Sequence, residues 1–263
     1  MSAGTILLER DDPIVPVVRI GQPAKRNAMT LDMWRQLGEA FTELADDADA
    51  RCIILAGAGG HFCSGADISE FGEVRSTPEQ GEAYEAVVEA CGEAIATIGK
   101  PTIAAISGIC IGGGFALAQT CDFRVAEPGA TFAIPAARLG IVYSRQECQT
   151  LLSLVGLAKA KEILFTAERF DGAEAHRIGF VDRLTAAGAD PLGPARDFAR
   201  RMSANAPLAI KGAKLMLNAL AAGEGDAQAR ALADIGLQAL ASDDYKEGVA
   251  AFAERRVPRF SGR

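Results

Sequence analysis

Over the first two thirds of the chain, hydrophobic residues fall into short runs rich in β-branched side chains that alternate with segments of helical periodicity. Four such runs predict strands, at residues 14–20, 51–57, 101–108 and 122–126. Between them, apolar residues recur on one face of residues 31–48 and 78–98, which predicts two amphipathic helices. This alternation favours an α/β fold with largely parallel strands.

The pattern changes in the last third of the chain. From Arg145 onward the segments are helical in character, and residues 181–184 form the single late strand that the pattern predicts. We therefore expect an α/β core over residues 1–200 and a helical C-terminal region over residues 201–263. We find no internal repeat and no low-complexity linker.

Composition and charge exclude several classes of protein. A net charge of -7 over 263 residues offers no basic surface for nucleic acid. No run approaches the ~18 apolar residues of a membrane span, and the first residues lack the pattern of a signal peptide, so we expect a cytoplasmic protein without a membrane partner. The six cysteines form no C-x-x-C pair, which favours buried reduced thiols and predicts no metal site.

Two loops rich in small residues each join a predicted strand to a predicted helix. Residues 57–71 read GAGGHFCSGADISEF, and residues 108–122 read GICIGGGFALAQTCD. In an open α/β sheet such loops lie side by side at the carboxyl ends of the strands, where ligands bind. Each loop can offer one backbone N–H, and two converging N–H groups would form an oxyanion hole. The alternative is that the glycines only permit close packing of helix on strand.

The spacing of the same glycines does not match a dinucleotide-binding motif. The fingerprint G-x-G-x-x-G would start at Gly112 and Gly114 but needs a small residue where Leu117 stands. The acidic residue expected about twenty positions later is also missing. A nucleotide-dependent oxidoreductase is therefore disfavoured.

Several motifs carry a resemblance that spans nearly the whole chain in order. They read PAKRNAMT (23–30), FCSGADISEF (62–71), KPTIAAISGICIGGGFALAQTCDFRVA (100–126), FAIPAARLGI (132–141), AKEILFTAERFDGAEAHRIGFVDRL (160–184) and AFAERRVPRF (251–260). Together they resemble the crotonase superfamily of enoyl-CoA hydratases and isomerases. The resemblance implies a crotonase-like spiral core of repeated β-β-α turns and C-terminal helices that assemble homotrimers, often paired into hexamers as dimers of trimers. It also implies an acyl-CoA thioester as substrate, which carries the coenzyme A itself, so no prosthetic group is expected.

The resemblance also implies site residues. The two backbone donors that stabilise a thioester enolate fall on Ala66 and Gly113. Coenzyme A contacts fall on Lys25, Arg26 and Ala28 near the phosphates, and on Ser64, Asp67 and Ile68 near the adenine and pantetheine. Basic side chains suit a phosphorylated carrier because charge-assisted hydrogen bonds are stronger than neutral ones.

The sequence departs from the family pattern at the two positions where hydratases carry glutamates. Here these positions are Ala116 and Ala136, and neither can transfer a proton to or from water. Family members that decarboxylate malonyl-type CoA esters do without this glutamate pair and place a tyrosine where Tyr143 stands. We therefore take Tyr143 as the third candidate catalytic residue and expect decarboxylase- or isomerase-type chemistry. The histidine of some of those decarboxylases would fall on Ala66, so this resemblance is partial.

Three alternatives stay open at this point. The chain could be a non-catalytic acyl-CoA-binding or structural member of the family, or a weak enoyl-CoA hydratase. Within the loop 142–147, Glu147 is a second protonatable group beside Tyr143. We interpret Trp34, in the first predicted helix, as a packing residue.

Overall fold

Six strands form the main sheet of the protein, whose computed structural model describes residues 4–262 apart from the side chains of residues 226, 228 and 232. Their order across the sheet is β1 (Thr5–Glu9), β2 (Val17–Gly21), β3 (Ile53–Gly57), β4 (Thr102–Ile106), β6 (Phe123–Ala126) and β9 (Arg183–Leu184). β1 runs antiparallel to β2, and every other pair is parallel. The predicted α/β fold with largely parallel strands is thus confirmed.

A second, smaller sheet contains β5 (Ile109–Ile111), β7 (Thr131–Ala133) and β8 (Phe170–Asp171). Two isolated parallel bridges, Cys63 to Cys110 and Met29 to Ala66, continue it toward the N-terminal part of the chain. Each turn of the chain therefore adds one strand to the main sheet and a shorter extended stretch to the second sheet before a helix follows. This is the repeated β-β-α spiral that the resemblance to the crotonase superfamily implies.

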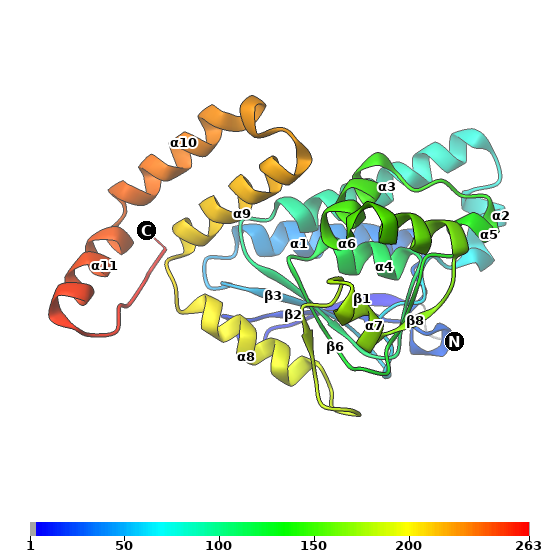
Figure 1. Cartoon of the computed structure of the whole chain (residues 1–263), viewed down its shortest axis with the longest axis horizontal. Helices are drawn as coiled ribbons and strands as arrows, with labels where there is room; N and C mark the ends of the chain where they lie inside the picture. The colour runs from blue at the N-terminus through cyan, green and yellow to red at the C-terminus, as the bar shows by residue number, and fades with distance from the viewer. Residues whose placement is uncertain (1–3, 263) are drawn as a thin grey trace.

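Helices cover both faces of the main sheet (Figure 1). On one face lie α1 (Leu31–Asp46), α3 (Pro78–Thr97), α4 (Gly113–Thr120) and α6 (Arg145–Thr166), with the short helices α2 (Phe71–Val74) and α5 (Ala136–Leu139) at one end of this layer. The short helix α7 (Gly172–Arg177) packs beside β7, β8 and β9. The larger hydrophobic core lies beneath these helices and includes Leu37, Phe41, Phe115 and Phe132. On the opposite face, α8 (Leu192–Ser203) covers a smaller hydrophobic cluster, which contains the side chains on that side of the sheet.

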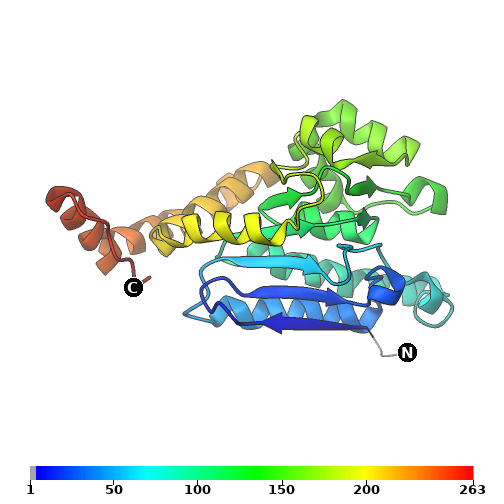
Figure 2. The same cartoon turned by 90° about the horizontal axis from the view of Figure 1, so that it is seen from below.

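The C-terminal helices α9 (Pro207–Ala222), α10 (Gly225–Ala241) and α11 (Asp243–Glu254) extend away from the sheet (Figure 2). The predicted boundary after residue 200 falls in the last turn of α8, which still packs on the sheet. No helix within residues 4–262 combines the length and the apolar character needed to cross a membrane.

Several short or half-exposed strands were not predicted. β5, β7 and β8 contain two or three residues each, which is too short for a period of two to emerge from the sequence. The prediction of a single late strand at residues 181–184 was wrong, because β8 also follows Arg145. β1 alternates less clearly because it lies at the sheet edge and none of its residues is fully buried.

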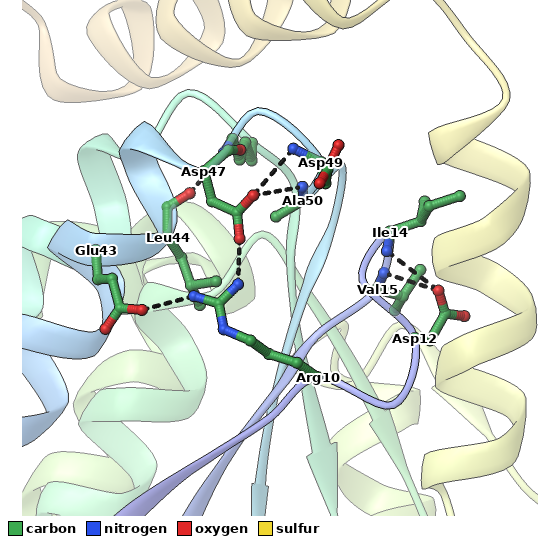
Figure 3. A network of polar contacts seen from close by, with 10 residues as sticks. Arg10, Asp12, Ile14, Val15, Glu43, Leu44, Asp47, Asp49 and Ala50 are labelled. Carbon is green, nitrogen blue, oxygen red and sulfur yellow. Dashed lines mark hydrogen bonds and ion pairs between the residues drawn. The ribbon is translucent and has the colours of Figure 1, made fainter.

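Polar contacts surround the turn before β2 and the C-terminal end of α1 (Figure 3). The Asp12 carboxylate accepts hydrogen bonds from the N–H groups of Ile14 (3.1 Å) and Val15 (3.3 Å), so this segment forms a turn and β2 starts only at Val17. Arg10, at the end of β1, pairs with Glu43 at 2.6 Å and with Asp47 beyond the end of α1. The network joins the sheet edge to the helix that precedes β3.

One ion pair anchors the C-terminal helices to the core. Asp122, which follows α4, accepts hydrogen bonds from the N–H (2.8 Å) and hydroxyl (3.0 Å) of Thr102 and pairs with Lys214 of α9 at 2.8 Å. The Lys214 side chain is only 6% exposed, and its ammonium also donates to the carbonyl of Lys100 at 3.0 Å.

Replacing Lys214 by methionine is expected to lower the free energy of unfolding by about 3 kcal/mol, because it leaves a mostly buried carboxylate without its cation. Urea denaturation followed by circular dichroism measures the effect. Lys246→Met is the matched control, since the exposed pair of Lys246 with Asp243 should contribute roughly 0–1 kcal/mol. Equal unfolding free energies for the two variants would contradict the anchoring role of Lys214.

Candidate functional site

Each glycine of the triplet at the start of α4 is required for a different reason. Gly112 has φ of 56° and ψ of -118°, a backbone conformation that side chains disfavour. A Cβ on Gly113 would lie 3.0 Å from the indole Cζ2 of Trp34, and a Cβ on Gly114 would lie 2.2 Å from the carbonyl oxygen of Cys63. The backbone conformation thus disfavours a side chain at Gly112, the Trp34 ring crowds one at Gly113, and the Cys63 backbone excludes one at Gly114.

The two loops singled out in the sequence lie side by side. Cys63 donates its N–H to the carbonyl of Ile109 at 2.9 Å, and Ile111 donates back to the carbonyl of Cys63 at 3.0 Å. Gly65 has φ of 101°, and a Cβ there would lie 3.2 Å from the backbone nitrogen of Gly113. The loops therefore meet backbone to backbone, which only small residues permit.

The backbone N–H groups of Ala66 and Gly113 are neighbours at this junction. A Cβ on Gly113 would lie 3.5 Å from the backbone nitrogen of Ala66. Within residues 4–262 neither N–H donates to a protein acceptor, whereas Gly112 donates to Ala133 and Asp67 donates to Met29. Gly113 is the first residue of α4, so its N–H has no partner within the helix. Two adjacent free donors can bind an oxygen on which negative charge develops.

The predicted coenzyme A residues cluster on the turn before α1 and on the loop after β3. The Lys25 ammonium donates to the Asp67 carboxylate at 2.6 Å and to the Ser69 hydroxyl at 2.9 Å. Ser64 donates its N–H to the carbonyl of Arg26 (3.0 Å) and its hydroxyl to the carbonyl of Lys25 (3.0 Å). The structure thus brings Lys25, Arg26, Ser64 and Asp67 together.

The remaining members of this cluster differ in exposure. Ala28 is buried and accepts a hydrogen bond from Gln22 at 2.6 Å, whereas Ile68 is 66% exposed. Burial raises the pKa of Asp67, but hydrogen bonds from Lys25 and Ser69 outweigh it and hold this pKa below its ordinary value. Asp67 is therefore ionised at neutral pH and pairs with the cation of Lys25.

Asn27 is a residue that the sequence analysis missed. Its side chain is fully buried, and its amide donates to the carbonyls of Ala58 (2.8 Å) and His61 (2.7 Å) while its oxygen accepts from the N–H of Gln22 (3.0 Å). Asn27 has φ of 59°, a conformation that asparagine tolerates better than most residues. The sequence shows only an asparagine next to the Lys25–Arg26 turn. In the structure, its side chain holds this turn against the loop after β3.

Tyr143 lies in the loop between α5 and α6 and packs against the larger core. Its hydroxyl is buried and has no hydrogen-bond partner among the described residues. Burial raises the pKa of Tyr143 far above its ordinary value, and charge on Glu147 and on Cys110 of β5 adds to this effect. The phenol therefore stays protonated at neutral pH, so it can donate a hydrogen bond or a proton but is not available as a base.

The two alanines at the hydratase glutamate positions are both buried. Ala116 lies in the first turn of α4 and donates to the carbonyl of Gly112 at 3.0 Å, and Ala136 is the first residue of α5. Methyl groups at these positions leave the two free N–H groups without an adjacent carboxylate from either helix. Any proton transfer at the site would have to involve another group.

Glu147 is the carboxylate nearest in sequence to Tyr143, and it closes a capping box at the start of α6. Its side chain accepts the N–H of Ser144 at 2.8 Å, and its own N–H donates to the Ser144 hydroxyl at 3.2 Å. Burial raises the pKa of Glu147, and charge on Glu85 and Glu89 of α3 raises it further.

Replacing Glu147 by glutamine is expected to stabilise the protein at neutral pH, because glutamine keeps the capping box and removes a disfavoured charge. The folded-state pKa of Glu147 lies above its unfolded value. In wild type, the stability contributed by the protonated carboxyl group is therefore complete at low pH and is lost as the pH rises through the folded pKa. The variant should therefore gain about 1.4 kcal/mol over wild type for each unit of pKa elevation at pH 7 and nothing at pH 3. Thermal or urea unfolding at both pH values measures this.

Glu79→Gln in the first turn of α3 is the opposite-sign control. Hydrogen bonds from its own backbone and from Thr77 lower the pKa of Glu79, so this variant should lose stability at neutral pH. A Glu147→Gln variant that is less stable than wild type at pH 7 would show that the carboxylate contributes a favourable interaction.

Comparison with known proteins finds a matching family, curated relatives and similar solved structures. A family described as Enoyl-CoA hydratase/isomerase matches residues 12–263. The chain is 35% identical, over 100% of both chains, to a protein named as a probable enoyl-CoA hydratase of Mycobacterium bovis. It is 33% identical to the peroxisomal Δ(3,5)-Δ(2,4)-dienoyl-CoA isomerase of Arabidopsis thaliana, covering 97% of this chain and 96% of that one. The crystal structure of an enoyl-CoA hydratase/isomerase family protein from Hyphomonas neptunium superposes with a TM-score of 0.92 at 34% identity, covering 98% of each chain.

Proposed function

Since the chain belongs to the enoyl-CoA hydratase/isomerase family, whose members process acyl-CoA thioesters, we propose that it stabilises a thioester enolate between the N–H groups of Ala66 and Gly113. The observation that carries this proposal is the adjacency of two backbone donors without a protein acceptor. Donors already in place need no reorganisation when charge develops on the thioester oxygen, which makes them effective in lowering the barrier.

The carrier is held by the cluster around the Lys25 turn. Lys25, Arg26 and Ala28 contact the coenzyme A near its phosphates, and Ser64, Asp67 and Ile68 contact it near the adenine and pantetheine. The ion pair between Lys25 and Asp67 supports this assignment, because it fixes a cation beside the loop that carries Ala66. The exposed side chain of Ile68 offers apolar surface to a ligand that arrives from solvent.

The chemistry that best fits these residues is decarboxylation of a malonyl-type CoA ester. The bond between the α-carbon and the carboxylate breaks, carbon dioxide leaves, and the electron pair moves into the thioester enolate held by Ala66 and Gly113. Tyr143 then donates its proton to the α-carbon and regains one from solvent. This sequence needs no base, which agrees with Ala116 and Ala136.

A second candidate is a member that binds acyl-CoA without turnover. It is favoured by the same two alanines, because neither α4 nor α5 carries a carboxylate that could transfer a proton. Incubation with malonyl-CoA and methylmalonyl-CoA, followed by mass analysis of the CoA esters, separates the two: loss of carbon dioxide supports the enzyme, and unchanged substrate with measurable calorimetric binding supports the binder. Absence of binding at millimolar acyl-CoA would exclude both.

Hydration of crotonyl-CoA is expected to be far slower than the enzyme median of about 10 per second, because no carboxylate activates water at either alanine position. The decrease in absorbance of the conjugated thioester measures the rate. A double variant that introduces glutamate at both Ala116 and Ala136 is the gain-of-function control. A wild-type rate near the median would show that another group activates water.

We also propose that the chain assembles into homotrimers or hexamers through its C-terminal helices. Exposed apolar side chains on α10 and α11, including Leu237, Leu240, Val249 and Phe252, support this, as does an apolar cavity of about 500 Å³ between α9, α10 and α11. Light scattering on a size-exclusion column gives the mass directly, and a monomer at micromolar concentration would refute this assignment.

A further inference from the structure

A hydrogen-bonded pair of buried aromatic side chains lies against Gly113. Trp34 of α1 donates its indole N–H to the hydroxyl of Tyr84 of α3 at 3.1 Å, and each residue is 2% exposed. The indole atoms Cζ2 and Cη2 lie 3.0 and 3.3 Å from the point that a Cβ on Gly113 would occupy. The ring therefore forms a wall that prevents the first residue of α4 from moving toward α1.

The same pair connects to the segment that follows Ala66. The ring of Tyr84 meets the ring of Phe71, the first residue of α2, edge to face at 5.7 Å. The Arg75 guanidinium lies 5.2 Å from the centre of the Phe71 ring and 5.3 Å from that of Tyr84, and it pairs with Glu85 of α3.

The start of α1 is attached to the same segment. Glu70, which directly precedes Phe71, accepts the N–H of Leu31 at 2.6 Å. The chain from Ala66 to Arg75 is thus bound to both helices that carry the aromatic pair. One end of the pair contacts the residue with the second donor, and the other end contacts the segment that begins at the first donor.

We propose that Trp34 and Tyr84 are positioning residues that set the separation of the Ala66 and Gly113 N–H groups; this rests on the proposed enolate-binding function. Neither side chain transfers a proton. Removing the Tyr84 hydroxyl removes the hydrogen bond that fixes the indole against Gly113, so the position of the Gly113 N–H relative to that of Ala66 is less precisely set. A misplacement of about 1 Å in such a site can cost about 10²-fold in rate.

The test observes the thioester carbonyl directly. Infrared difference spectra of [1-¹³C]acetyl-CoA bound to wild type, Tyr84→Phe and Tyr245→Phe report the strength of the hydrogen bonds to that oxygen without turnover. We expect the carbonyl frequency to fall on binding to wild type and to the α11 control Tyr245→Phe, and to recover toward the free value in Tyr84→Phe. Affinity for acetyl-CoA should stay within about twofold, because the carrier contacts lie elsewhere, and kcat on the turnover substrate should fall about 10- to 10²-fold at constant KM.

The outcomes separate this inference from the proposed function. No frequency shift in wild type would overturn the enolate-binding function and the positioning role together. A wild-type shift that Tyr84→Phe retains in full would overturn only the positioning role.

A size-complementation pair gives a second test that does not depend on the Tyr84 variant folding. Gly113→Ala alone should weaken the shift because its methyl group meets the indole. Combining it with Trp34→Phe removes the opposing ring atoms and should restore part of the shift. Failure of the double variant to recover, with both proteins folded by circular dichroism, would contradict the role of Trp34 as the wall.

Discussion

Replacing Gly113 by proline is expected to reduce enolate chemistry by at least about 10²- to 10³-fold, the loss typical of deleting one oxyanion donor. Proline lacks the N–H but suits the first position of a helix, where Gly113 stands in α4, so the helix itself should form. The rate of decarboxylation of a malonyl-type CoA ester measures the loss, and circular dichroism and calorimetric binding of CoA confirm that the variant is folded.

Gly113→Ala is the control for this experiment, because it adds a Cβ against Trp34 but keeps the N–H. The alanine variant should therefore retain more activity than the proline variant. Equal losses would show that the contact with the indole, and not the donor, determines the rate. Undiminished turnover in a folded proline variant would place the oxyanion site elsewhere in the protein.

Replacing Tyr143 by phenylalanine is expected to lower turnover by about 10²- to 10⁴-fold while leaving CoA affinity unchanged, as expected for the loss of a proton donor. The hydroxyl is available for this role because it stays protonated at neutral pH and has no protein partner within residues 4–262. Initial rates on malonyl-type and enoyl-CoA substrates, with calorimetric titration in parallel, measure the two effects.

The stability of the Tyr143→Phe variant gives an independent check. Because the hydroxyl forms no hydrogen bond with the described part of the chain, its removal should leave the free energy of unfolding unchanged or raise it. Tyr84→Phe should instead be destabilised by about 1 kcal/mol or more, since it leaves the buried indole N–H of Trp34 without an acceptor. Equal turnover of wild type and Tyr143→Phe would return Tyr143 to a packing role and direct attention to Glu147.

The fold was predictable where the pattern is long and strongly periodic. α1 and α3 fall within two residues of the predicted ranges, and the central strands β3, β4 and β6 lie inside the predicted runs. The short strands of the second sheet were not predictable from period, because their pairing is decided by neighbours far away in the sequence. The repeated β-β-α arrangement was predicted from the resemblance to the crotonase superfamily and not from local sequence patterns.

The candidate site was predictable as two loops but not as a set of contacts. The sequence shows three consecutive glycines, yet it does not show that Trp34 faces Gly113 or that Cys63 faces Gly114. It likewise gives no sign that Asn27 holds the Lys25 turn or that Tyr84 supports the indole. These contacts join residues 30 or more positions apart, so they depend on the tertiary fold.

The position of Trp34 beside Gly113 also gives this protein an intrinsic fluorescent probe at its candidate site. Trp34 is the only tryptophan in the 263 residues, so emission excited at the red edge of the protein's absorption comes from that one ring. The ring is buried and hydrogen-bonded to Tyr84, which fixes the dielectric surroundings of its excited state. We expect a thioester bound at the proposed donors, Ala66 and Gly113, to change the surroundings of the indole, because the ring lies against Gly113. Ligand arrival, and its rate, can therefore be followed in real time by stopped-flow fluorescence on the unlabelled natural chain.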